Sequence, residues 1–69
     1  MTITTYFDDS DDPIWMFSAP GYEDNPFPHP LDRDYLRRAD RPPTREQAER
    51  WARWVGLDLE DGWTLEVSR

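Results

Sequence analysis

Residues 2–20 read TITTYFDDSDDPIWMFSAP, which places two strand-like runs on either side of a short acidic segment. Its first part, residues 2–7, alternates in polarity and is rich in β-branched and aromatic side chains, as a half-buried strand requires. Its last part, residues 14–19, is apolar on both faces, which indicates a strand covered on both sides. Five polar residues and Pro13 join the two runs, so the stretch predicts a β-hairpin.

The next segment, residues 20–30, reads PGYEDNPFPHP and is dominated by proline. Proline has no backbone N–H to donate and therefore interrupts both helices and sheets. We predict a proline-rich connecting loop over residues 20–30, with an extended, polyproline-like backbone.

A first helix is predicted to begin at Pro30, because the first helical position needs no backbone N–H. Acids follow in its first turn, and Arg37 and Arg38 stand in its last turn, as the helix dipole favours. Pro42 and Pro43 are expected to end it.

The clearest element is the second helix, TREQAERWARWVGL at residues 44–57. Thr44 and Gln47 have the spacing of a capping box, and Gly56 is placed to end the helix in a left-handed conformation. A buried stripe is expected at i, i+3, i+4 and i+7 spacing. Its members are Ala48, Trp51, Ala52 and Val55.

A last strand is predicted after the turn at Asp61 and Gly62, where apolar and polar residues alternate over residues 63–68. The order is therefore β-β-α-α-β. We predict an α+β fold in which a small antiparallel sheet, made of the N-terminal hairpin and the C-terminal strand, carries one or two helices on one face.

The chain has 69 residues, which predicts a single small acidic domain over residues 1–69. It contains no cysteine and a single histidine, His29, so neither a disulfide nor a zinc site is expected to reinforce the core. Ten aromatic side chains, four of them tryptophan, remain as the means of stabilisation, through dense packing or through contact with a partner, a homodimer included.

The net charge of the chain limits the class of partner that it can bind. The chain carries 15 acids against 8 bases, a net charge of −7, and direct binding to nucleic acid requires the opposite sign. A larger protein with a basic surface is the complementary partner. All eight bases are arginine, which is typical of a GC-rich genome such as that of an actinobacterium or its phage. The N-terminus has no secretory pattern and no apolar run is long enough to cross a membrane, so we expect a cytoplasmic protein without membrane contact.

Four aspartates, Asp8, Asp9, Asp11 and Asp12, stand within five positions of the hairpin connection. The spacing imitates the start of a calcium loop, but that loop needs glycine where Pro13 stands, so no metal site is predicted. A solvated turn explains the backbone, because Asp and Ser favour turns. Such a turn needs only one or two acids, and the surplus indicates either solubility or a surface that steers a partner.

Acids in three separate segments, at residues 8–12, 23–24 and 58–61, leave a second interpretation open. If they align in space, they imitate phosphates and the chain is a DNA-mimic inhibitor of the anti-restriction type. The arginines of the two helices interrupt such a row. A third interpretation is a structural subunit of a homo-oligomer or larger assembly.

Two tryptophans are candidates for contact with a partner. Trp54 falls outside the buried stripe of the second helix, and Trp15 lies in a strand that is apolar on both faces. Tryptophan dominates the energetics of protein interfaces, although packing within the domain explains either position as well.

The sequence contains no catalytic or cofactor motif, so neither enzyme activity nor a cofactor is expected. The leading hypothesis is an acidic protein-binding module that acts as an inhibitor or adaptor by covering a basic surface of a larger partner. The residues predicted to bind that partner are Asp8, Asp9, Asp11, Asp12, Trp15, Glu23, Asp24 and Trp54.

Overall fold

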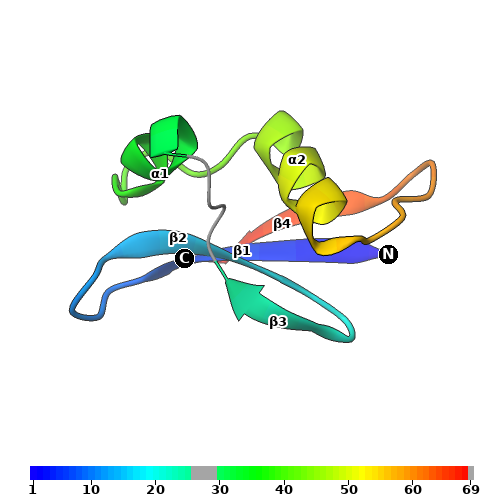
Figure 1. The fold of residues 1–69 in the computed structure, drawn as a ribbon, viewed down its shortest axis with the longest axis horizontal. Coiled ribbons are helices and arrows are strands. Elements are labelled where there is room, and N and C mark those ends of the chain that lie inside the picture. Colours follow the sequence, from blue (N-terminus) through cyan, green and yellow to red (C-terminus); the bar gives the residue numbers. More distant parts are fainter. Residues whose placement is uncertain (26–29, 69) are drawn as a thin grey trace.

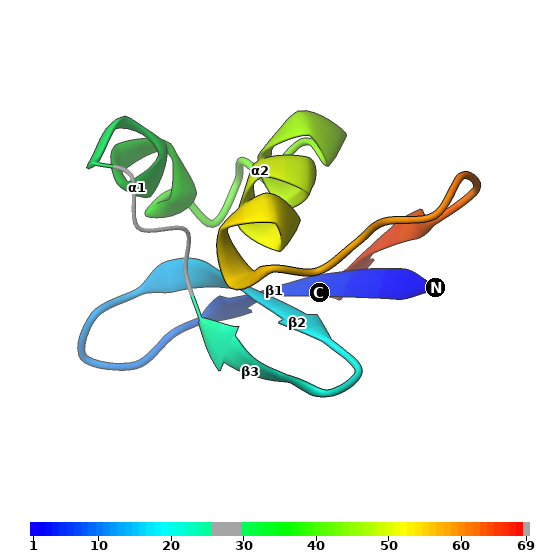
Figure 2. The same cartoon turned by 45° about the vertical axis from the view of Figure 1, so that its right-hand side comes forward.

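The structure, a computed structural model, describes residues 1–25 and 30–68 and forms two layers (Figures 1 and 2). The elements in chain order are β1 (Thr2–Asp8), β2 (Ile14–Ala19), β3 (Tyr22–Asn25), α1 (Pro30–Leu36), α2 (Arg45–Val55) and β4 (Thr64–Ser68). The strands lie in the order β3-β2-β1-β4, and both helices cover the same face of the sheet. The predicted α+β class and the order hairpin, two helices, final strand are confirmed, with β3 as an addition.

The hairpin forms as predicted, with β1 and β2 antiparallel. Thr5 faces Phe17 and Tyr6 faces Met16 in its register. Because successive side chains point to opposite faces, Thr5 and Phe17 lie on the helix-covered face, where both are buried, and Tyr6 and Met16 lie on the open face. The buried Thr5 hydroxyl donates a hydrogen bond to the Met16 carbonyl at 2.8 Å, which satisfies its polar group.

The last strand corrects the prediction of an antiparallel sheet. β4 pairs with β1 in parallel, with Ile3 opposite Leu65 and Thr5 opposite Val67, so the sheet is mixed. A short hairpin imposes antiparallel pairing, but β4 is reached through both helices, and a long crossover removes that constraint. Residues 57–63 return the chain to the start of β1, where the Thr64 N–H donates to the Met1 carbonyl at 3.0 Å.

β3 was not predicted, because it lies within the segment assigned as a proline-rich loop. Tyr22–Asn25 pairs antiparallel with β2 through an irregular register. Four residues without proline follow the turn at Gly21, whose φ of 83° favours glycine, and an edge strand needs partners on one side only. Residues 26–29, which hold two of the prolines and His29, lie outside the described residues.

α2 confirms its predicted caps. The Gln47 N–H donates to the Thr44 hydroxyl at 3.2 Å, and the Thr44 N–H donates to Gln47 Oε1 at 2.9 Å, which completes the capping box. At the other end, Gly56 adopts φ 84° and the Leu57 N–H donates to the Ala52 carbonyl at 2.8 Å.

α1 ends earlier than predicted, at Leu36, well before the prolines. Beyond it the chain forms turns, and the Arg38 carbonyl accepts the Trp15 indole N–H at 2.8 Å. This bond anchors the segment between the helices to β2, on the inner side of the sheet.

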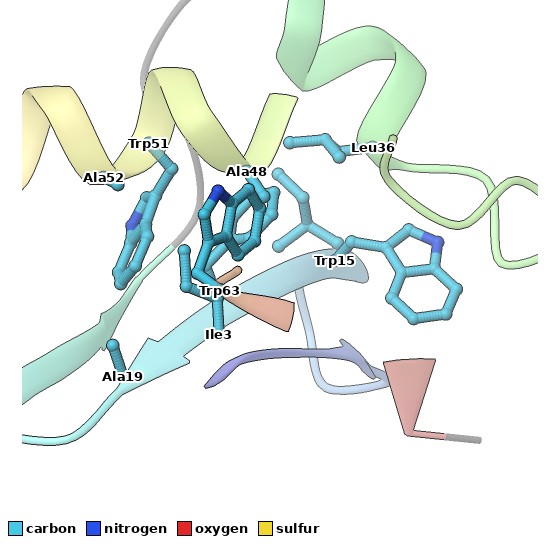
Figure 3. Packing of buried hydrophobic residues seen from close by; sticks show 10 residues of the cluster. Ile3, Trp15, Ala19, Leu36, Ala48, Trp51, Ala52 and Trp63 are labelled. Carbon is cyan, nitrogen blue, oxygen red and sulfur yellow. The ribbon is translucent and has the colours of Figure 1, made fainter. Parts of the chain in front are cut away.

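The core fills the space between the helices and the inner face of the sheet (Figure 3). The Trp51 ring points from α2 towards the sheet (Figure 3) and stacks on Phe17, with ring centroids 5.5 Å apart and an angle of 21° between the rings. The buried apolar residues are Ile3, Ile14, Trp15, Phe17, Ala19, Leu36, Ala48, Trp51, Ala52 and Trp63.

Candidate protein-binding surface

The aspartates of the hairpin turn differ in their surroundings. Asp12 forms ion pairs with Arg37, at 2.5 Å, and with Arg33, at 3.9 Å, so it connects the turn to α1. Asp9 and Asp11 are exposed, and within residues 1–25 and 30–68 neither forms an ion pair. Asp12 therefore has a structural partner, whereas its neighbours present uncompensated charge to solvent.

Tyr6 gathers further acids on the open face of the sheet. Its hydroxyl donates a hydrogen bond to Asp24 of β3 at 2.5 Å. This bond, burial and the charges of Asp24 and Asp8 raise the pKa of Tyr6 from 10.0 to about 12. The pKa of Asp24 is lowered below its usual value of 3.8, mainly by the hydrogen bond from Tyr6 and to a smaller extent by one from Ser18. Asp8 and Asp24, distant in sequence, thus act on the same phenol.

Glu66 of β4 extends this surface across the sheet. It lies opposite Thr4, two residues before Tyr6 in β1, and so belongs to the same open face. We use the name acidic face for the acids on the open face and at the adjoining hairpin turn that have no arginine partner among the described residues. These residues are Asp8, Asp9, Asp11, Asp24 and Glu66.

The arginines of the described chain lie in the other layer, in α1, in α2 and in the segment between them. Several are neutralised there. Arg50 contacts Asp32 of α1 at 3.4 Å and Glu46 of its own helix at 2.9 Å, and Arg38 contacts Asp40 at 3.4 Å. No residue of the four strands is an arginine, whereas residues 30–56 hold seven arginines and five acids, so the negative charge is concentrated in the sheet layer.

We predict that the phenol of Tyr6 titrates at a higher pH than the usual 10.0 of a tyrosine. Its folded pKa is raised, so its contribution to stability is complete below pH 10.0, the usual pKa, and is lost as the pH rises through about 12. Spectrophotometric titration of the tyrosinate band should resolve one late phenol. In Asp24→Ala, that phenol should titrate earlier, because the hydrogen bond and the charge are both absent. An unchanged titration would show that Tyr6 and Asp24 do not interact.

The two candidate tryptophans lie in different places. Trp15 is only 2% exposed, because it lies on the helix-covered face, with Phe7 against its ring at a centroid distance of 5.6 Å. The prediction that Trp15 contacts a partner is therefore corrected, since its side chain has no free surface. A strand that is apolar on both faces does not reveal which of its residues is covered.

Trp54, in contrast, is 53% exposed. It stands on α2, in the helical layer, whereas Tyr6 and Asp24 lie on the other side of the sheet. The structure therefore does not bring Trp54 together with the acidic face. Glu23, also predicted to bind the partner, lies in β3, but its side chain is outside the described part of the structure.

The structure also contains a hollow of about 360 Å³ beside α2, which was not predicted from the sequence. Residues 57–63 pass alongside the helix, and the lining of the hollow combines the apolar Leu57, Leu59 and Trp63 with Glu49, Arg53 and several acids. The Arg45 guanidinium lies 3.9 Å from the centre of the Trp63 ring and donates to the Trp63 carbonyl at 2.9 Å. No sequence pattern could reveal the hollow, because it depends on how this loop packs.

Among the described residues, no three histidine or acidic side chains are grouped closely enough to hold a metal ion. No helix in the same residues has the length and apolar character needed to cross a membrane. No protein-family model, curated protein or solved structure matches this chain.

Proposed function

We propose that the chain is a small acidic protein-binding module whose acidic face docks on a basic surface of a larger protein. The separation of charge between the two layers carries this proposal. The acids of the acidic face lie on the strands and the hairpin turn and have no arginine partner among the described residues, whereas the described arginines lie in residues 30–56, most of them in ion pairs. A one-signed surface steers an oppositely charged partner and fixes the orientation in which it binds.

Such a module acts by covering its partner, as an inhibitor or an adaptor. Proteins that handle nucleic acid present basic surfaces, and they include the enzymes of bacterial defence that a phage must disarm. A DNA-mimic inhibitor is the special case in which the covered surface is the channel for nucleic acid. The five acids of the acidic face supply charge for either case.

The experiment is affinity capture from the lysate of a GC-rich bacterium, with the chain tagged at Met1. The test variant carries Asp8→Asn, Asp9→Asn and Asp11→Asn, which leaves Asp12 and its arginine partners intact. The matched control carries Asp58→Asn, Glu60→Gln and Asp61→Asn, which removes the same charge from the loop after α2.

We expect wild type and control to retain one basic protein and the test variant to lose it. Equal retention by both variants would remove the acidic face from the mechanism. Recovery of the bait alone would instead favour the structural subunit.

A further inference from the structure

The two edges of the sheet are built differently. β3 is a strand of four residues whose register with β2 is irregular, and proline follows it in the sequence. Natural proteins protect sheet edges by such means, because an open edge pairs with other chains. β4, in contrast, keeps a regular register with β1 over all five residues and contains neither proline nor a basic residue. The β4 edge therefore lacks both the irregular register and the following proline that limit pairing at the β3 edge.

The pairing of β4 with β1 shows which of its backbone N–H and C=O groups point away from β1, to the open edge of the sheet. The Thr64 N–H points to β1, since it donates to the Met1 carbonyl. Successive residues of a strand direct their backbone groups alternately to the two sides, so those of Leu65 and Val67 point to the open edge. Val67 is also one of the exposed large apolar residues, at 36%. An unpaired backbone edge beside apolar side chains has the features of a site for an added strand.

We propose that β4 binds an extended segment of the partner as a fifth strand of the sheet. This inference rests on the proposed function and gives it a binding mode. The side chains of the added strand would alternate, with apolar residues beside Leu65 and Val67 and lysine or arginine beside Glu66. A second copy of this chain fits the edge less well, because each copy carries a net charge of −7 and would place a second Glu66 near the first.

A defined peptide tests the pairing. The probe is an octapeptide that alternates valine and arginine, blocked at both ends, and the control peptide has the same sequence with every backbone nitrogen methylated. Both carry the same charge, but only the first can donate backbone hydrogen bonds. The protein variant is Val67→Pro, which removes an outward N–H and leaves the bonds to β1 in place. Its fold is checked by circular dichroism.

We expect the alternating peptide to bind and to slow amide hydrogen exchange at Leu65 and Val67. Methylation of the peptide, or Val67→Pro in the protein, should weaken binding by roughly tenfold or more. The two peptides are compared on wild-type protein, so the test holds even if Val67→Pro fails to fold.

Three results would overturn the inference. Equal binding of the two peptides would show that charge alone holds them, and the proposed function would stand without edge pairing. No binding of the alternating peptide at millimolar concentration would exclude the added strand. A wild-type dimer in sedimentation that Val67→Pro abolishes would assign the edge to a second copy.

Discussion

Trp51→Ala is expected to lower the free energy of unfolding by about 3–5 kcal/mol, the range for removing a large buried aromatic side chain. Trp51 is fully buried and stacks on Phe17, so it holds α2 against the middle of the sheet. A domain of this size has a total stability of about 3–10 kcal/mol, so this variant should be partly or wholly unfolded at room temperature.

Urea unfolding followed by far-ultraviolet circular dichroism measures the loss. The matched control is Trp54→Ala, three positions further along the same helix, where the side chain is 53% exposed. We expect the control to change stability by less than about 1 kcal/mol. Similar losses in the two variants would contradict the described orientation of α2.

The second large effect concerns association with the captured partner. Charge reversal by Asp8→Lys, Asp9→Lys and Asp11→Lys should lower the association rate constant by about tenfold or more at low salt, because steering depends on the charge nearest the contact. The same reversal at Asp58, Glu60 and Asp61 gives the same net charge and should have a smaller effect. Stopped-flow mixing measures both rate constants, and equal values would show that only net charge matters.

Local signals in the sequence were sufficient for the hairpin and for α2. Alternation over residues 2–7 placed Thr5 and Tyr6 on opposite faces, and the caps at Thr44 and Gly56 identified both ends of the helix. These features depend on neighbours within a few residues, and the sequence states them directly.

The rest of the fold depends on contacts between distant segments. The parallel pairing of β4 follows from the path of the chain through both helices. β3 was not predicted because prolines precede and follow it in the sequence. The segment after α1 is held by the hydrogen bond from Trp15 to Arg38, which joins residues 23 positions apart. No local pattern predicts these contacts.

The candidate site shows the same division. The acids of residues 8–12 were visible as a cluster, but the pairing of Asp12 with Arg37 and the approach of Asp24 to Tyr6 require the folded chain. The contrast between buried Trp15 and exposed Trp54 likewise follows from which face the helices cover.

The most direct test of the acidic face is the rate constant for association with the captured partner. It is measured as a function of ionic strength for wild type and for the two charge-reversed variants. Salt screens attraction between exposed charges, so the wild-type rate should fall steeply as salt increases. We expect the control reversed at Asp58, Glu60 and Asp61 to keep most of this dependence, and the variant reversed at Asp8, Asp9 and Asp11 to lose or invert it. Coincident curves for the two reversed variants would contradict a role for the acidic face.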